Sequence, residues 1–197
     1  MNIQGKFPNT RLRRNRMKEF SRRLVAENNL SADDLILPLF VCEGNNIENP
    51  IQSMPGVSRY SIDKLLHKVE EAVKLSIPAI AIFPQIETSL KNAEGSLAFD
   101  ENNLVCRSIK SIKKEFSGIG IICDVALDPF TDHGHDGLVV NDKIDNDKTL
   151  DILEKQALVQ VNAGCDVIAP SDMMDGRIGK IRKYLDKHNY QNIQLLS

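Results

Sequence analysis

The segment "DVALDPFTDHGHDG", residues 124–137, holds four aspartates and two histidines within fourteen positions. It directly follows the apolar run "IGIIC", residues 119–123. A continuous apolar run of this length is typical of a strand that is buried on both faces of a parallel sheet. Acidic and imidazole groups are therefore concentrated where a buried strand is predicted to end, and the arrangement of the whole chain decides what they do there.

Apolar runs alternate with amphipathic helical segments along the rest of the chain. Helices are predicted at residues 61–77, 102–116 and 148–164 and around Ile178, Ile181 and Leu185, with Ser61 placed to cap the first and Gly164 to end the third. Strands are predicted at residues 35–42, 79–84, 119–127 and 166–170, and a fifth begins in "NIQLLS", residues 192–197. This βα alternation, four units and the start of strand five, predicts a parallel sheet with right-handed crossovers.

An open doubly wound sheet and a (β/α)₈ TIM barrel both satisfy this alternation. A doubly wound nucleotide-binding protein normally has a glycine-rich turn after its first strand, whereas "VCEGNNIENP", residues 41–50, has one glycine. In a barrel the loops at the carboxyl ends of the strands build the active site. The polar segments 84–96, 128–137 and 170–177 fall at those ends, and the barrel is therefore the predicted fold.

Composition and charge exclude several classes of protein. The net charge of −2 gives no general attraction to nucleic acid or to a membrane surface. No apolar run approaches the ~18 residues that cross a bilayer, and the first residues lack the apolar core of a secretory signal. The four cysteines form no C-x-x-C pair, which argues against a zinc ribbon or a dithiol redox site and favours buried thiols. We expect a cytoplasmic protein.

Several motifs carry a resemblance to a known family. Together with residues 124–137, the segments "LILPLFVCEG" (35–44), "IQSMPGV" (51–57), "SIPAIAIFP" (76–84) and "APSDMMDGRIG" (169–179) resemble, in order and spacing, porphobilinogen synthase, also called delta-aminolevulinic acid dehydratase. The resemblance covers about residues 11–197. It implies a hydro-lyase that condenses two 5-aminolevulinate molecules to porphobilinogen with loss of water, in tetrapyrrole (heme) biosynthesis. It also implies an N-terminal oligomerisation arm at residues 1–30 and an incomplete TIM-barrel catalytic domain at residues 31–197.

The resemblance also implies a pair of lysines, at least one of which forms a Schiff base with the substrate ketone. Both would lie beyond Ser197, so we expect residues 1–197 alone to be inactive. Asp124 either orients a catalytic lysine or closes a turn, and the resemblance favours the catalytic role. Ser171 and Asp172 border the substrate cavity in the family, although both residue types also cap helices. The alternative function is a non-catalytic half barrel that acts only in assembly or metal binding.

The same loop predicts the kind of metal. Members of the family that resemble zinc enzymes carry cysteines at the positions of Ala126, Asp128 and Asp136. Carboxylate oxygens suit magnesium or a monovalent ion, whereas thiolates suit zinc, so the catalytic zinc of the family is not expected here. A divalent metal is expected at Asp128 and Asp136, magnesium rather than zinc. No organic cofactor is expected. His133 and His135 either ligate or form hydrogen bonds. A metal-dependent hydrolase using this H-x-H motif is a weaker alternative, because in hydrolase barrels the motif usually closes the first strand.

The basic segment "RLRRNRMKEFSRRLVAENN", residues 11–29, predicts a partner surface. Met17, Phe20 and Leu24 fall on one helical face, and we expect another subunit to cover them, giving a homo-oligomer that is octamer-like by resemblance. The run "RLRRNR" is short and lacks interleaved aromatic residues, so nucleic acid is not expected. Near the fourth predicted strand, Met173 and Met174 are predicted to pack in the core. Residues 175–177 either shape the start of the fourth helix or contact a neighbouring wall of the site.

Overall fold

The computed structural model describes residues 5–197, which fall into two units that meet between Asp34 and Leu35. The first unit contains the short helices α1 (Arg14–Met17) and α2 (Glu19–Leu24) and the 3₁₀ turn η1 (Ala32–Asp34). Lys18 has an extended backbone, with φ −116° and ψ 148°, and this interrupts the helical stripe that the sequence predicts. Met17, Phe20 and Leu24 are all exposed, and their role in oligomerisation stays a prediction.

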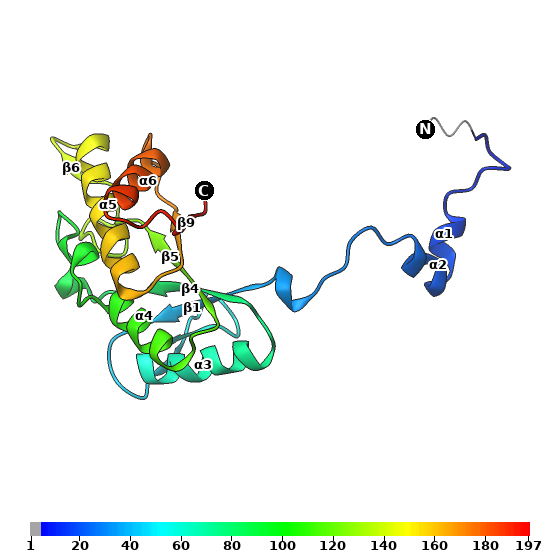
Figure 1. Ribbon diagram of the computed structural model, residues 1–197, viewed down its shortest axis with the longest axis horizontal. Coiled ribbons are helices and arrows are strands. Elements are labelled where there is room, and N and C mark those ends of the chain that lie inside the picture. The colour runs from blue at the N-terminus through cyan, green and yellow to red at the C-terminus, as the bar shows by residue number, and fades with distance from the viewer. Residues whose placement is uncertain (1–4) are drawn as a thin grey trace. The chain divides into compact units, whose positions relative to one another are not determined.

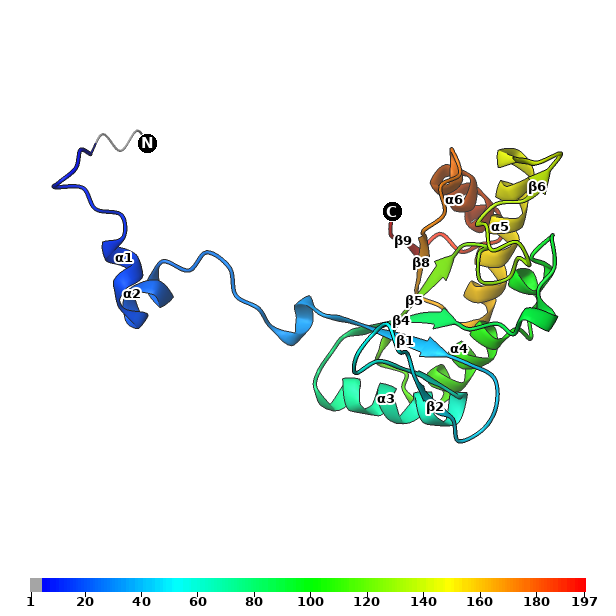
Figure 2. The same cartoon turned by 180° about the vertical axis from the view of Figure 1, so that it is seen from behind.

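The second unit is built on one mostly parallel sheet. Its parallel strands are β1 (Ile36–Val41), β4 (Ala79–Pro84), β5 (Gly120–Val125), β8 (Val167–Pro170) and β9 (Gln194–Leu195). These strands confirm the five that the apolar runs predict. Ile82 pairs with Leu39 on one side and with Cys123 on the other, and Cys123 pairs with Ile168. Carboxyl ends therefore lie along one edge of the sheet, as the arrowheads in Figures 1 and 2 show.

Two short strands extend the sheet beyond β1, and the sequence analysis missed both. They are β2 (Glu48–Pro50) and β3 (Ser58–Tyr60), and the order across the sheet is β2-β3-β1-β4-β5-β8-β9. A separate hairpin, β6 (Val139–Val140) and β7 (Lys143–Ile144), turns through Asn141 and Asp142, both with positive φ. The α/β class with a mostly parallel sheet is therefore confirmed, but no closed barrel forms within residues 5–197: β2 and β9 are free edges.

Four helices pack on the sheet, and their ends follow local side-chain chemistry. They are α3 (Ile62–Lys74), α4 (Leu104–Glu115), α5 (Asn146–Ala163) and α6 (Arg177–Lys187), with 3₁₀ turns η2 (Thr88–Leu90) and η3 (Ser96–Phe99). The side chain of Asn103 accepts a hydrogen bond from the Cys106 amide at 2.8 Å and caps α4. Gly164, with φ 111°, ends α5 as predicted. Ser61 precedes α3, but its hydroxyl accepts from the Ile47 amide instead of capping the helix.

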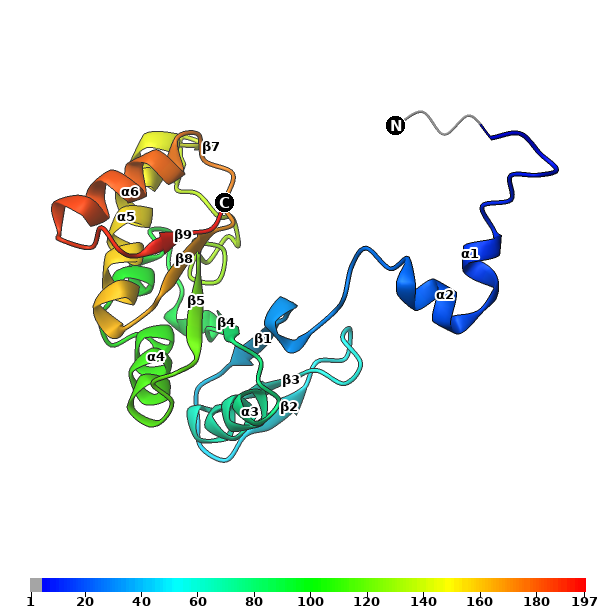
Figure 3. The same ribbon diagram turned by 45° about the vertical axis from the view of Figure 1, so that its right-hand side comes forward.

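The hydrophobic core lies between the helices and one face of the sheet. Figure 3 shows α4, α5 and α6 together on one side of strands β5, β8 and β9. Side chains alternate along a strand, so Ile121, Cys123 and Val125 of β5 are buried in this core. Asp124, between Cys123 and Val125, therefore belongs to the opposite face. The helices fix the strands from one side and leave the carboxylate of Asp124 available on the other.

Candidate active site

The loops that follow β4 and β5 are tied together by their backbones. The Asn92 amide donates to the Phe130 carbonyl at 3.3 Å, and the Asp132 amide donates to the Asn92 carbonyl at 3.2 Å. Asn92 and Thr131 thereby form an isolated parallel bridge beyond the ends of the strands. The polar segments that the sequence places after these two strands are thus held against each other at the carboxyl edge of the sheet.

Asp124 and Ser171 join the ends of β5 and β8. The Ser171 hydroxyl donates to Asp124 Oδ1 at 2.6 Å. Burial raises the pKa of the Asp124 carboxyl, the hydrogen bond from Ser171 acts against this, and the nearby charge of Asp128 raises the pKa further. A carboxyl with a raised pKa and a fixed hydroxyl partner can exchange a proton closer to neutral pH than an ordinary aspartate does.

Two buried glutamines on α5 hold the backbone on which Asp124 sits. Gln160 Nε2 donates to the Asp124 carbonyl at 2.9 Å, and Gln156 Nε2 donates to the Ala126 carbonyl at 3.1 Å. Both glutamines are 1% exposed. The sequence analysis missed them, although two amides four residues apart on the apolar face of a helix are a recognisable signal. Each bond gives a partner to a backbone carbonyl near the carboxyl end of β5.

Two hollows open at this edge of the sheet, and Asp128 borders both. The inner hollow, about 350 Å³, is lined by Phe40, Arg59, Phe83, Pro84, Gln85, Ile86, Lys91, Asp124, Asp128 and Pro129. The loop hollow, about 400 Å³, is lined by Ala126, Asp128, Gly134, His135, Asp136, Ser171 and Met173. Of the predicted site residues, the structure therefore brings Asp124, Asp128, Asp136 and Ser171 together around two adjoining cavities.

Arg59 and Lys91 are functional candidates that the sequence analysis did not identify. Both side chains line the inner hollow with Asp124 and Asp128. Lys91 follows the turn η2 in the loop after β4, and Arg59 is the central residue of β3. Neither position stands out in the sequence, because their approach to the acids depends on where the loop after β4 and the short strand β3 are placed.

The two predicted metal ligands, Asp128 and Asp136, both line the loop hollow. Partial burial raises the pKa of Asp128, the negative charge of Asp136 raises it further, and Lys91 lowers it. His135 Nδ1 lies 2.9 Å from Asp136 Oδ1. The His135 amide donates to His133 Nδ1 at 3.1 Å, so His133 serves as a hydrogen-bonding residue within the loop.

These donors suit some metals and not others. Within residues 5–197, no group of three or more His, Cys, Asp or Glu side chains lies close enough to hold a metal ion on its own. Structural and catalytic zinc sites need at least three such ligands, so the described residues do not fit zinc. Magnesium keeps several of its waters and is commonly bound through one or two carboxylates, and Asp128 and Asp136 fit that requirement.

Each cysteine thiol either lies away from these carboxylates or is in an environment that disfavours metal binding. Cys106, Cys123 and Cys165 are buried in the core on the helix side of the sheet, as the sequence predicts, and Cys42 is half-buried. Burial raises the pKa of the Cys106 thiol to about 12. Burial also raises the pKa values of Cys42 and Cys123. Thiolates, the form that binds zinc, are therefore disfavoured at these three positions.

Asp172 has a structural environment that differs from that of Ser171. It is 2% exposed, its Oδ1 accepts a hydrogen bond from the Met174 amide at 2.7 Å, and Arg177 Nε lies 3.4 Å from its Oδ2. These contacts shape the turn that leads into α6. Met174 is buried as predicted, whereas Met173 is 70% exposed, so the prediction that Met173 packs in the core is wrong. Met173 instead lines the loop hollow.

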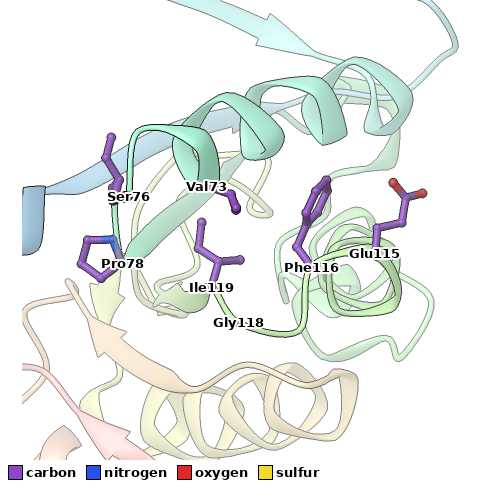
Figure 4. A pocket seen from close by; sticks show the side chains of 8 residues that line it. Val73, Ser76, Pro78, Glu115, Phe116, Gly118 and Ile119 are labelled. Carbon is purple, nitrogen blue, oxygen red and sulfur yellow. The ribbon is translucent and has the colours of Figure 1, made fainter.

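A third hollow lies at the opposite, amino-terminal ends of β4 and β5. It has a volume of about 420 Å³ and is bordered by the ends of α3 and α4. Figure 4 shows Val73, Phe116 and Ile119 around the space, while the carboxylate of Glu115 points away from it. This hollow is largely apolar and contains none of the predicted site residues, so the carboxyl edge is the candidate active site.

Comparison with known proteins gives a consistent result. A family model described as "Delta-aminolevulinic acid dehydratase" matches residues 9–197. The delta-aminolevulinic acid dehydratase of Bradyrhizobium diazoefficiens is 55% identical over 187 residues, which cover 95% of this chain and 53% of that protein. The one from Chlamydia pneumoniae is 45% identical over 187 residues, 95% of this chain and 56% of that protein. The chain thus spans about half the length of these curated relatives.

A solved structure is similar over the same region. The delta-aminolevulinic acid dehydratase (porphobilinogen synthase) of Toxoplasma gondii ME49, crystallised with its reaction product porphobilinogen, matches with a TM-score of 0.92 and 41% identity. The match covers 95% of this chain and 53% of that one. No helix within residues 5–197 has both the length and the apolar character needed to cross a membrane.

Proposed function

The chain belongs to the delta-aminolevulinic acid dehydratase family, and on that premise we propose that its carboxyl-edge site serves the condensation of two 5-aminolevulinate molecules to porphobilinogen with loss of water. The observation that carries the proposal is the hydrogen bond between Asp124, which lines the inner hollow, and Ser171, which lines the loop hollow. It occurs in a fold that matches, with a TM-score of 0.92, a relative crystallised with porphobilinogen.

The charges around the inner hollow suit this substrate. 5-Aminolevulinate is a zwitterion with an ammonium group at one end, a carboxylate at the other and a ketone between them. Asp124 and Asp128 offer negative charge, and Arg59 and Lys91 offer positive charge, around the same cavity. Groups of both signs can therefore fix the direction in which the substrate lies, which is the main contribution of a site that brings two molecules together.

Asp124 is the residue to which we assign proton transfer. Condensation and dehydration require protons to leave carbon and nitrogen and to be returned to a departing oxygen. The raised pKa of Asp124 suits both directions of transfer, and Ser171 keeps one carboxylate oxygen in a fixed position. The Schiff-base step expected for the family needs an amine within bonding distance of the substrate ketone, and the carboxylate of Asp124 would favour the charged form of such an amine before reaction.

Magnesium rather than zinc is the metal we propose for this site. Asp128 and Asp136 would hold it, with water completing its coordination. When bound, the ion supplies positive charge that stabilises negative charge developing on a substrate oxygen. For the N-terminal unit we propose a role in homo-oligomer assembly, supported by the exposed apolar side chains of Met17, Phe20 and Leu24.

Ligand titration tests the proposed function with this chain. Porphobilinogen or 5-aminolevulinate added to ¹⁵N-labelled protein should shift the amide signals of Asp124 and Ser171 and of the residues lining the inner hollow. The variant Asp124→Ala should lose these shifts, and Glu115→Ala, at the opposite end of the strands, should keep them. A colour assay for porphobilinogen on the same samples separates catalysis from binding alone. Shifts confined to other surfaces, or identical in Asp124→Ala, would contradict the assignment.

A further inference from the structure

The turn between β8 and α6 begins at Ser171 and depends on side-chain contacts for its shape. Within the described part of the chain, residues 171–173 make no hydrogen bond between backbone groups. The far end of the turn is fastened to the start of α5, because the Asp175 amide donates to Asn146 Oδ1 at 2.8 Å and Asn146 Nδ2 donates to the Asp175 carbonyl at 3.3 Å. The end that carries Ser171 is therefore held by other contacts.

Asp172 supplies such a contact from a buried position. Its side chain has no exposed surface, and its Oδ1 accepts a hydrogen bond from the Met174 amide at 2.7 Å. An aspartate that accepts from a backbone amide just ahead of it closes a tight turn of its own backbone. This contact therefore fixes the conformation of residue 172 and, with it, the direction in which the preceding residue, Ser171, presents its hydroxyl.

Arg177 holds both Asp172 and Met174 in place. Its Nη1 donates to the Met174 carbonyl at 3.0 Å, and its Nε lies 3.4 Å from Asp172 Oδ2. Neither Asp172 Oδ2 nor Arg177 Nε makes a hydrogen bond to a described residue. A buried carboxylate is costly unless a positive charge balances it, and the ion pair with Arg177 provides that balance. Two side chains of opposite charge thus bind the amide and the carbonyl of the same residue.

We propose that Asp172 is a positioning residue, which together with Arg177 fixes the turn so that the Ser171 hydroxyl stays on Asp124. This inference rests on the proposed function only in taking Asp124 as the residue that transfers protons. Ser171 is exposed, so its own surroundings do little to keep its hydroxyl 2.6 Å from Asp124 Oδ1. The carboxylate of Asp172 is buried and lines neither hollow at this edge of the sheet, so its effect on the reaction passes through Ser171.

The position of Ser171 and the charge of Asp172 have opposite effects on the pKa of Asp124. The hydrogen bond from the Ser171 hydroxyl lowers this pKa, so displacement of Ser171 should raise it. Loss of the negative charge of Asp172 should by itself lower the pKa of Asp124, because a nearby like charge disfavours ionisation. The direction of the change in a variant therefore distinguishes positioning from direct electrostatics.

The pKa of Asp124 would be measured from the ¹³C shift of its carboxyl in wild type, Ser171→Ala, Asp172→Ala, Asp172→Asn and Arg177→Lys. Asp172→Asn removes the same charge as Asp172→Ala but keeps an oxygen that can accept from the Met174 amide. Arg177→Lys keeps the positive charge but loses the planar group that reaches both Asp172 and Met174. Amide spectra report whether each variant keeps the fold.

Asp172→Ala should raise the pKa of Asp124 about as much as Ser171→Ala does, and Arg177→Lys should raise it by a smaller amount. Asp172→Asn should not raise it. Leu185→Ala is the control for lost stability alone, because Leu185 is a fully buried residue of α6, and this variant should leave the pKa of Asp124 unchanged. Urea unfolding at pH 7 measures the stability of each variant.

An unchanged or lowered pKa of Asp124 in Asp172→Ala would overturn the proposal, as would an equal rise in Asp172→Asn or in Leu185→Ala. If Asp172→Ala does not fold, an unchanged pKa in Arg177→Lys overturns it. The measurement needs no ligand and no turnover. A failure to bind porphobilinogen would therefore count against the proposed function and leave this result standing.

Discussion

Replacement of Ser171 by alanine should change both the pKa of Asp124 and the stability of the fold. The substitution removes the hydroxyl that donates to Asp124 Oδ1 at 2.6 Å and leaves the backbone of residue 171 in place. Because this hydrogen bond favours the charged carboxylate, its loss should raise the pKa of Asp124 above the already raised wild-type value. The matched control is Ser171→Thr, which keeps a hydroxyl at the same position.

The expected magnitude is modest because the bond is near solvent. A hydrogen bond to a charged group contributes ~1.5–3 kcal/mol when it is well buried. Ser171 is exposed, so about 1 kcal/mol is the appropriate expectation at pH 7. This difference between wild type and Ser171→Ala is present while Asp124 is ionised. It is lost as the pH falls through the folded-state pKa, since the protonated carboxyl gains less from the hydroxyl.

In wild type, Asp124 already makes the stability of the fold depend on pH, and the sign of this dependence is defined. Burial raises the folded-state pKa of Asp124, so the protonated carboxyl favours folding below its unfolded pKa, and that contribution is lost as the pH rises through the folded pKa. Urea unfolding of wild type and both variants at pH 7 and pH 3 measures the stabilities, and the ¹³C shift of the Asp124 carboxyl measures its pKa. A Ser171→Ala variant with an unchanged Asp124 pKa, or with the same stability loss at both pH values, would refute the reasoning.

Three further outcomes follow from the described contacts. Leu153→Ala should destabilise the fold by about 2–5 kcal/mol in urea unfolding, because this fully buried side chain lies in the core between α5 and the sheet; a loss below 1 kcal/mol would show that the core closes over the cavity. Elemental analysis should find no stoichiometric zinc, and a zinc-selective chelator should leave porphobilinogen binding unchanged; one tightly held zinc per chain would contradict the oxygen-ligand site. Deletion of residues 1–28 should lower the number of subunits per particle, calculated from the mass measured by light scattering. An unchanged number of subunits would argue against an assembly role for the first unit.

The parallel strands were predictable because each is an apolar run long enough to be buried on both faces. The runs at residues 35–42, 79–84 and 119–127 contain β1, β4 and β5 within one or two residues of their bounds. β2 and β3 were missed because "ENP" and "SRY" are three residues each and carry no apolar periodicity. Such short strands form when a neighbouring strand supplies partners for their backbones, which is a tertiary effect that local sequence does not contain.

Closure of the sheet into a barrel does not follow from the alternation of strands and helices. Alternating strands and helices predict a parallel sheet with right-handed crossovers, and the pairing of β1, β4, β5, β8 and β9 confirms that these strands are parallel. They do not determine whether the first and last strands pair to close a barrel, because closure depends on strand tilt and on the number of strands that take part. The structure accordingly confirms the α/β class with a mostly parallel sheet and shows an open sheet within residues 5–197.

The site divides in the same way into local and non-local parts. Asp124, Asp128 and Asp136 were identifiable because they lie together in one segment directly after a buried strand. The sequence also placed Ser171 after the next parallel strand, and strand pairing brings Val125 opposite Pro170, one residue before it. Asp172, adjacent in sequence, was expected to share this role, yet its side chain is buried against the Met174 amide and Arg177.

Lys91 and Gln160 show why the rest of the site could not be found in the same way. Gln160 reaches the strand end from a helix that begins after it, and Lys91 reaches the hollow from a loop whose position depends on two backbone hydrogen bonds to another loop. In each case the contact is made by a residue far from residues 124–137 in sequence. The acidic segment determines where charge must be balanced, but the packing of the neighbouring elements determines which side chains balance it. A metal requirement inferred from the acids alone therefore leaves out Lys91, whose positive charge lowers the pKa of Asp128.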